Sequence, residues 1–250
     1  MGTMSLSDKR RESMKGVSDA SRIAGRVALL RNSPLFEGLS EKECEKIASY
    51  ARARTFARDE MIFMQGQPLR NLALIRTGSV KITQLSSKGS EVILWMHGCG
   101  SVVGMLSESS ARHNPCSACA MEHCTALVWE FASLQNLMVD YPKLRKNAAH
   151  ILASRLGELE ERFREVATEK VSRRLAYALL RLLKHIGKAV DEGIEVSLSR
   201  DELAQMTGTT LFTISRILSK WGEMGFILPR REAVVVRDAR QLEMAGNEDS

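Results

Sequence analysis

Alternating apolar and polar residues form short runs through the first half of the chain. Turn residues, mainly Gly, Pro and Ser, separate most of six such runs, which cover residues 55–57, 61–64, 71–76, 79–85, 91–97 and 126–131. This regular short spacing predicts an antiparallel β sandwich or roll. A helix should precede it, because Ser40 is followed three residues later by Glu43, a capping-box pattern that opens a helix running to about Ala51.

The spacing of apolar residues becomes helical after residue 132. Between Lys143 and Ala167 they recur at alternating steps of three and four, a narrow stripe typical of coiled coils. A stripe this narrow buries little within its own chain, which predicts pairing with a second copy; packing on the β domain is the alternative. The interface residues expected on this basis are Leu152, Leu156, Leu159, Phe163 and Val166.

Residues 199–218 carry the pattern of a helix-turn-helix. Ser199 and Glu202 form a second capping box, Gly208 supplies the turn, and apolar residues on one helical face anchor a second helix. A further amphipathic helix is expected just before this unit, at residues 170–187. Two helices that meet at a corner for purely structural reasons can share part of this pattern. The prediction of DNA binding therefore depends on the neighbouring elements.

In a DNA-binding helix-turn-helix, the second helix presents its N-terminal residues to base edges in the major groove. A wing is expected to follow it, formed by short strands at 226–231 and 233–237, with turn arginines that contact phosphates. Arg216 is suited to bidentate reading of guanine. The residues expected to contact double-stranded DNA are Thr210, Leu211, Thr213, Ser215, Arg216, Lys220, Arg230 and Arg231.

Charge is divided unevenly along the 250 residues. The formal net charge is +6, with −1 on residues 33–142 and +6 on residues 143–240. The basic second half suits a polyanionic partner, although helical surfaces are often rich in Lys and Arg. The expected organisation is a polar, basic lead-in at 1–32, an effector-sensing β-roll domain at 33–140, a dimerisation helix at 141–168, a DNA-binding domain at 169–240 and an acidic tail at 241–250.

Neither a membrane span nor a secretory signal is expected. No run of eighteen apolar residues occurs, and the first thirty residues lack an apolar central stretch. A cytoplasmic location follows as an expectation. Five cysteines are an odd number for such a chain, which favours thiol, metal or redox chemistry over a disulfide framework.

The order of these elements resembles the family of the cyclic-AMP receptor protein and FNR. The likeness rests on residues 76–80 (RTGSV), on the long central helix and on residues 213–218 (TISRIL). It implies an α+β fold with an N-terminal double-stranded β-helix, the β roll of cyclic-nucleotide-binding domains, and a C-terminal winged helix-turn-helix. It also implies a homodimeric bacterial transcription regulator that binds palindromic DNA and has RNA polymerase as a partner.

Departures from the family pattern argue against cyclic AMP as the effector. Cyclic-nucleotide members carry a Gly-Glu pair that holds the ribose and an Arg-Ser or Arg-Thr pair that neutralises the phosphate. This chain has Gly104 followed by Met105, and Cys116 followed by Ser117, at these places. Without the Arg, a buried phosphate lacks its bidentate partner. Phe212, where the family's DNA motif has Glu, predicts a different operator sequence.

Cysteines occupy the region of the missing phosphate site. Three follow CxxC-x4-C spacing and a fourth lies on an upstream glycine turn, so four thiolates are expected to converge as metal ligands: Cys99, Cys116, Cys119 and Cys124. Thiolates favour zinc or an iron–sulfur cluster, and a cluster suits a sensor of oxygen, nitric oxide or redox state. The alternatives are structural zinc, a redox-active dithiol, incidental buried cysteines, or another effector such as a haem-bound gas or a small organic ligand.

A different class of protein, a metalloenzyme or an electron carrier, is the competing interpretation of the cysteines. Against it, the sequence contains no paired carboxylates, nucleophile motif or phosphate loop. Such a protein also has no need of a basic wing. The sequence therefore predicts a DNA-binding regulator that is not an enzyme.

Overall fold

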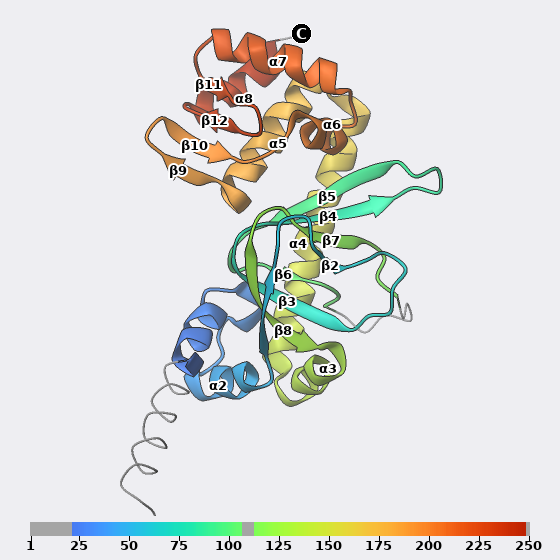
Figure 1. The fold of residues 1–250 in the computed structure, drawn as a ribbon, viewed down its shortest axis with the longest axis vertical. Coiled ribbons are helices and arrows are strands. Elements are labelled where there is room, and N and C mark those ends of the chain that lie inside the picture. Colours follow the sequence, from blue (N-terminus) through green and yellow to red (C-terminus); the bar gives the residue numbers. More distant parts are fainter. Residues whose placement is uncertain (1–21, 107–112, 249–250) are drawn as a thin grey trace, which may run out of the picture.

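The chain folds into two domains joined by one long helix, α4 (Pro142–Thr168) (Figure 1). The computed structural model describes residues 22–106 and 113–248. The N-terminal domain is a β roll flanked by helices, and the C-terminal domain is a helix-turn-helix with a small sheet. The predicted α+β architecture of roll, central helix and winged helix-turn-helix is therefore confirmed.

Two four-stranded antiparallel sheets form the roll, with strand orders β1-β8-β3-β6 and β2-β7-β4-β5. A core of mainly apolar residues fills the space between the sheets, as in other packed sheet pairs. The strands are β1 (Arg52–Phe56), β2 (Met61–Phe63), β3 (Asn71–Thr77), β4 (Val80–Leu85), β5 (Glu91–His97), β6 (Val102–Val103), β7 (Ser117–Ala120) and β8 (Cys124–Glu130).

All six predicted runs become strands, but the apolar pattern does not reveal β6 and β7. Strand β6 is two residues long, too short for any alternation to register. Strand β7 consists of Ser, Ala and Cys, which lack the β-branched and aromatic side chains that mark a strand. The sequence predicts its single cysteine, Cys119, as a metal ligand, whereas β7 pairs with both β2 and β4 in the middle of its sheet.

Helices close one end of the roll. Helix α2 (Glu41–Ser49) begins with the predicted capping box, in which Glu43 N donates to Ser40 Oγ and Ser40 N donates to the Glu43 carboxylate. A short 3-10 helix, η1 (Pro34–Phe36), precedes it. Residues 22–31 are also helical and bury Leu30 in the same core, so this part of the predicted lead-in belongs to the domain. Residues 1–21 of that lead-in lie outside the described residues.

Helix α4 runs along the roll and continues to the C-terminal domain. It follows α3 (Phe131–Asp140), and Leu144 and Ala148 near its start are buried in the core that α2 also covers. Further along, Arg155 donates to the Val102 carbonyl at 2.6 Å, and Arg162 donates to backbone carbonyls of β5. One face of α4 is therefore fixed to the roll by buried contacts.

The C-terminal domain packs four helices around a small antiparallel sheet of order β11-β12-β10-β9. Apolar faces of its helices, together with Ile93 and Met96 of β5, form one buried cluster, so the two domains share a core. Its elements are α5 (Val171–Ile186), β9 (Lys188–Val190), β10 (Gly193–Val196), α6 (Arg200–Thr207), α7 (Leu211–Glu223), β11 (Ile227–Pro229), β12 (Val234–Val236) and α8 (Ala239–Glu248).

The predicted acidic tail is largely helical. Residues 241–248 belong to α8, which packs on α5 and buries Leu242 and Ala245. Leu242 and Ala245 are three residues apart, the spacing of one helical face, whereas the prediction rested on the acidic composition of the segment. Residues 249–250 lie outside the described part of the chain. Among the residues that are described, no helix is both long and apolar enough to cross a membrane.

Candidate nucleic-acid interface and sensing region

The helix-turn-helix is built as its sequence predicts. Helix α6 begins with the capping box of Ser199 and Glu202, and it ends at Gly208, whose left-handed φ of 62° suits glycine. Thr210 caps the start of helix α7, and its hydroxyl accepts a hydrogen bond from Thr213 N. Ile214, on the inner face of α7, is fully buried. The outer face of α7 is thereby held in a fixed orientation.

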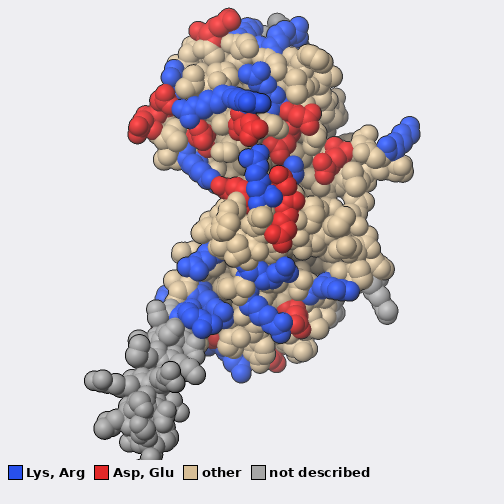
Figure 2. All heavy atoms as spheres, in the orientation of Figure 1, with Lys and Arg blue, Asp and Glu red and all other residues tan. Residues whose placement is uncertain are grey.

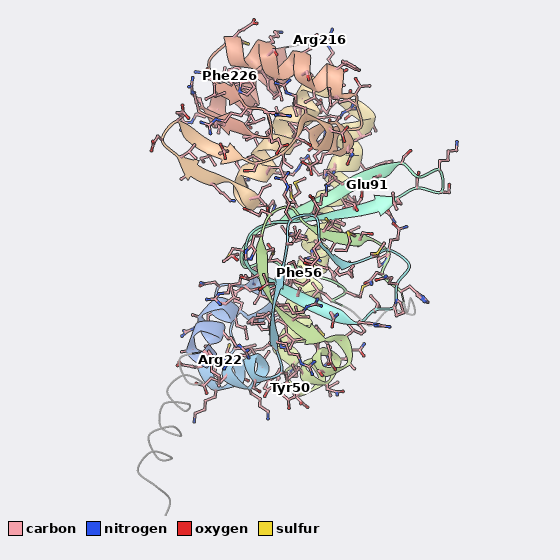
Figure 3. The ribbon with its side chains drawn as sticks, viewed as in Figure 1. Arg22, Tyr50, Phe56, Glu91, Arg216 and Phe226 are labelled. Carbon is pink, nitrogen blue, oxygen red and sulfur yellow. The ribbon has the colours of Figure 1, made fainter. Side chains whose placement is uncertain are left out.

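The predicted base-reading residues lie on the free side of α7. Figure 3 shows Arg216 at the end of the molecule farthest from the roll. Thr210, Leu211, Arg216 and Lys220 are exposed. Within the described chain, Arg216 forms no ion pair, so its guanidinium is available to a ligand. Phe212, next to Leu211, is 82% exposed, which is unusual for an aromatic side chain on a soluble domain.

The two wing arginines differ in their surroundings. Arg230 donates to Glu195 and Glu192, both at 2.5 Å, so its charge is already compensated. Arg231 is exposed at the turn. Beside it, Glu232 pairs with Arg58 of the roll at 3.4 Å. The prediction treated Arg230 and Arg231 as equivalent. Only the fold shows that Glu195 on β10 and Glu192 on the turn before it lie beside Arg230.

Charge on the surface is mixed. On the face drawn in Figure 2, acidic and basic side chains are interspersed over the C-terminal domain and do not form a single basic patch. The net charge of +6 on residues 143–240 therefore does not correspond to a uniformly basic surface on this face. Recognition depends on the particular side chains that α7 presents.

The predicted dimer stripe on α4 is mostly exposed within one chain. Phe163 is 76% exposed, and Leu156, Leu159 and Val166 are also exposed, which leaves a continuous apolar strip without a partner in the described chain. Leu152 differs, because it is half-buried and packs on the core of the N-terminal domain. This apolar strip lies beside the side of α4 that carries Arg155 and Arg162, and it is open to solvent.

The four predicted cysteine ligands do not come together. Cys116 and Cys124 contribute to the core of the roll, whereas Cys119 lies on the other face of β7, paired in register with Lys81. This follows from strand geometry, since residues three apart point to opposite faces. Cys99 is exposed on the β5–β6 turn, where its Sγ donates to the Arg76 carbonyl.

The described geometry does not bring the expected metal or cluster ligands together in one site. Across residues 22–106 and 113–248, no group of three or more His, Cys, Asp or Glu side chains could hold a metal ion. Burial also raises the pKa of Cys116 and Cys119, and burial with the nearby Glu122 raises the pKa of Cys124 to about 11. These groups are thiols at neutral pH, and the geometry does not fit a four-thiolate ligand set.

Positions that bind a cyclic nucleotide in the resembled family have structural roles here. The Ser117 hydroxyl accepts a hydrogen bond from Gln65 N at 2.9 Å, which fixes β7 to the loop after β2. Gly104 has a φ of +122°, and its backbone approaches Asn71 so closely that a side chain would crowd it. Met105 and Cys116 offer no charge for a phosphate.

Two charged contacts at the domain junction were not expected from the sequence. Lys81 on β4 pairs with Glu202 on α6 at 3.0 Å, and Glu165 on α4 accepts both hydrogen bonds of a bidentate pair with Arg181 on α5. Glu165 is only 3% exposed. Its position within a run of charged helix residues carries no signal of burial, and only the packing of α5 on α4 reveals it.

Comparison with known proteins gives matches over both domains. The family described as "Cyclic nucleotide-binding domain" matches residues 53–141, and the "Crp-like helix-turn-helix domain" matches residues 173–245. The chain is 31% identical over 214 residues to the cyclic AMP receptor protein of Thermus thermophilus, with 86% of this chain and 97% of that protein covered. It is 27% identical to electron transport regulator A of Shewanella oneidensis over 78% of this chain and 79% of that protein.

Solved structures share the fold. FixK2 from Bradyrhizobium japonicum superposes with a TM-score of 0.69 at 23% identity, over 78% of this chain and 96% of that one. The fold and its helix-turn-helix define a DNA-binding transcription regulator. The chain belongs to the CRP/FNR family of transcription regulators, which are not enzymes.

Proposed function

We propose that this regulator binds palindromic DNA as a homodimer, with two α4 helices paired along their apolar strips. The observation that carries the proposal is the open face of α7, whose capped N-terminus and free Arg216 point away from the roll. The exposed strip of Leu156, Leu159, Phe163 and Val166 supports the pairing. A twofold pair of reading helices requires two half-sites of the same sequence.

The contacts to DNA divide into two kinds. Thr210, Leu211, Thr213, Ser215 and Arg216 would reach base edges, with Arg216 reading a guanine. Phosphates would be held by Lys220 and Arg231, whereas Arg230 would support the wing through its two carboxylate partners. The downstream partner that we propose is RNA polymerase at the promoter, as expected of a DNA-bound regulator of this family.

The effector that we propose is a small molecule and not an iron–sulfur cluster. The separation of Cys119 from Cys116 and Cys124 favours the organic-ligand alternative over cluster-based sensing of oxygen, nitric oxide or redox state. Zinc has no assembled set of three ligands in the described residues either. Cyclic AMP is disfavoured because the Arg that would neutralise its phosphate is absent.

Selection of bound duplexes from a random pool tests the DNA function. We expect the purified chain to enrich an inverted repeat, and its affinity to fall as salt rises because phosphates are neutralised. The Arg216→Ala variant is the control for base reading, and the repeat it enriches should lose its preference at the base pair that Arg216 reads. Failure of the wild-type chain to enrich any sequence at low salt would contradict the proposal.

A further inference from the structure

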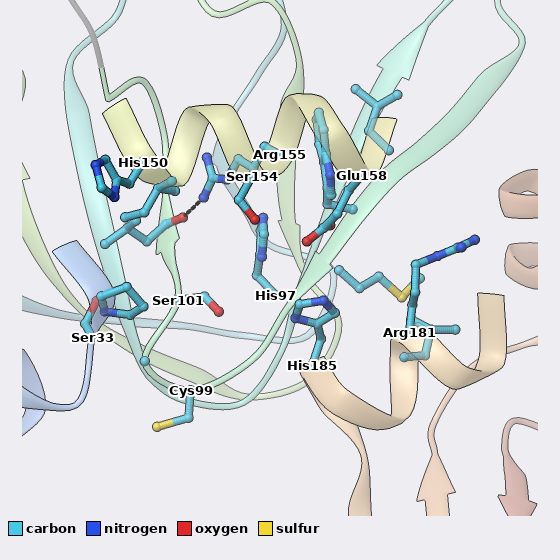
Figure 4. A pocket seen from close by; sticks show the side chains of 18 of the residues that line it. Ser33, His97, Cys99, Ser101, His150, Ser154, Arg155, Glu158, Arg181 and His185 are labelled. Carbon is cyan, nitrogen blue, oxygen red and sulfur yellow. Dashed lines mark hydrogen bonds between the residues drawn. The ribbon is translucent and has the colours of Figure 1, made fainter. Parts of the chain in front are cut away.

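A cavity of about 450 Å³ lies at the junction of the two domains (Figure 4), within the usual range for ligand pockets. Its wall comes from five parts of the chain: the segment around η1, the β5–β6 region, the middle of α4, the end of α5 and Met206 of α6. None of the family's cyclic-nucleotide positions, Gly104, Met105, Cys116 and Ser117, lines it. It is therefore a separate space, outside the core of the roll.

Three arginines, Arg155, Arg162 and Arg181, line the cavity together with two carboxylates, Glu37 and Glu158, and Arg181 is paired with Glu165. Arg155 extends from α4 to the cavity wall, where it is held by its hydrogen bond to Val102 O (Figure 4). Burial lowers its pKa, and it forms no ion pair within 4 Å in the described chain, so its charge lacks a close carboxylate partner. A second guanidinium, that of Arg162, also lines the space and donates only to backbone carbonyls. Glu158 is the nearest opposing charge on the wall of α4.

Polar and apolar groups accompany these arginines. Ser33 Oγ and Trp95 Nε1 are buried without a hydrogen-bond partner among the described residues, and both residues line the cavity. Unpaired buried donors are costly, which points to an absent partner. His97 and His185 lie side by side on the wall, and burial together with Arg155 and His185 lowers the pKa of His97 to about 3, so it is neutral.

We propose that this cavity binds a small organic anion, carrying a carboxylate or phosphate, with Arg155 as its charge partner. Arg155 supplies a charge-assisted donor, while apolar residues such as Trp95 and Met96 suit the organic part. The same set of side chains argues against a metal ion, since no group of three ligating residues occurs in the described ranges.

Occupancy of the cavity would control the orientation of the DNA-binding domain. Its floor includes the turn after β5, where the Gly98 backbone touches the His185 carbonyl with no room for a side chain. His185 is at the end of α5, the helix that leads into the helix-turn-helix. This consequence rests on the proposed function, whereas binding of the anion itself does not.

Binding is tested by the fluorescence of Trp95 and by calorimetry on the full chain. The probes are benzoate, citrate and 3-phosphoglycerate, with neutral benzamide as the matched control. We expect at least one anion to bind one per chain and to change the fluorescence, and benzamide not to bind. Trp129 and Trp221 are fully buried in other cores, so the Trp95→Phe variant should remove the fluorescence signal.

Two variants locate the site. Arg155→Gln should weaken the bound anion by at least about tenfold, the effect of losing one charge-assisted hydrogen bond. Ser154 is exposed on the cavity wall, so Ser154→Phe should block the space without removing a core contact. Glu161→Phe, about two turns along the same face and outside the cavity, is the control and should bind normally.

Three results would overturn the anion site: no binding by any of the three anions, equal binding of benzamide, or binding that both Arg155→Gln and Ser154→Phe leave unchanged. DNA selection is measured separately on the same preparations. Anion binding without any DNA enrichment would contradict the proposed function and leave the site standing. The two failures are therefore distinguishable.

Discussion

Lys81 Nζ lies 3.0 Å from Glu202 Oε1, and this ion pair joins the β roll to the first helix of the helix-turn-helix. Only about a fifth of each side chain is exposed, 20% for Lys81 and 19% for Glu202. Glu202 is at the same time the capping residue that holds the start of α6 through Ser199. One carboxylate therefore couples the position of the DNA-binding domain to the sensing domain.

Removal of this pair should loosen the domain junction. Lys81→Met keeps the capping box but leaves Glu202 half-buried without its cation, which we expect to cost about 1–2 kcal/mol in the free energy of unfolding. Hydrogen exchange at the first turn of α6 should become faster. Arg58→Gln breaks the exposed pair with Glu232 and is the matched control, with a cost below about 0.5 kcal/mol. Equal effects of the two variants would show that burial of the pair does not matter.

Acid should weaken the same contact. Burial by itself would raise the pKa of Glu202. The hydrogen bonds from Ser199, together with the hydrogen bond and positive charge of Lys81, outweigh burial, so the pKa of Glu202 lies below the usual 4.5. The stability that the carboxylate contributes is thus present above pH 4.5 and is lost as the pH falls through the lowered pKa. Denaturant unfolding of wild type and Glu202→Gln checks this: the difference between them should shrink as the pH falls below 4. A difference that stays constant from pH 7 to 3 would refute it.

Base reading should depend on Arg216 far more than on Arg230. Loss of a bidentate guanine contact costs about 1–3 kcal/mol per half-site and relaxes specificity at that base pair. Arg230→Ala should change affinity little, because the side chain is already engaged by Glu192 and Glu195. Fluorescence anisotropy on the selected duplex measures both, and Arg231→Ala should lower the slope of log affinity against log salt by about one. A larger loss for Arg230→Ala than for Arg216→Ala would reverse these assignments.

Iron should be absent from the purified chain. Because Cys119 is separated from Cys116 and Cys124 by the thickness of a strand, no cluster can be held by the predicted set in this fold. Protein prepared without oxygen should have no visible cluster absorbance and no stoichiometric iron or sulfide. Cys119→Ser should leave DNA affinity the same in air and without oxygen. If the wild-type chain contains stoichiometric iron and Cys119→Ser loses it, the chain does hold a cluster through Cys119.

Helix starts and turns could be predicted from the sequence because each is decided by residues within one short segment. Capping boxes at Ser40 and Ser199 and the glycine turn at Gly208 depend on neighbours a few residues away, and the structure confirms each of them. Strand runs with branched residues were also recognised. Strand β7 was missed because its Ser, Ala and Cys residues are stabilised by the sheets around them and not by their own propensity.

The sensing region could not be predicted because it depends on distant contacts. The spacing of the cysteines placed them close in sequence, but the pairing of β7 with β4 decides which face each one occupies. Arg155 is similar, since nothing in the stripe on α4 distinguishes an arginine that faces solvent from one that enters a cavity. Contacts between segments distant in sequence, and not residue type, decide which face each cysteine occupies and whether Arg155 enters a cavity.

Dimerisation should depend on the exposed strip of α4. Leu159 lies within that strip, so Leu159→Arg would set two arginines against each other across a twofold axis in an apolar seam. We expect the variant to sediment with the mass of one chain, 27.8 kDa, and the wild type to sediment with twice that mass. Glu161→Arg adds the same side chain at an exposed position on the opposite face of the helix and should remain dimeric. A Leu159→Arg protein that remains dimeric would show that the interface does not lie on this strip. If Leu159→Arg unfolds, Phe163→Ser takes its place. It removes the most exposed apolar side chain of the strip and should weaken the dimer without disturbing either core.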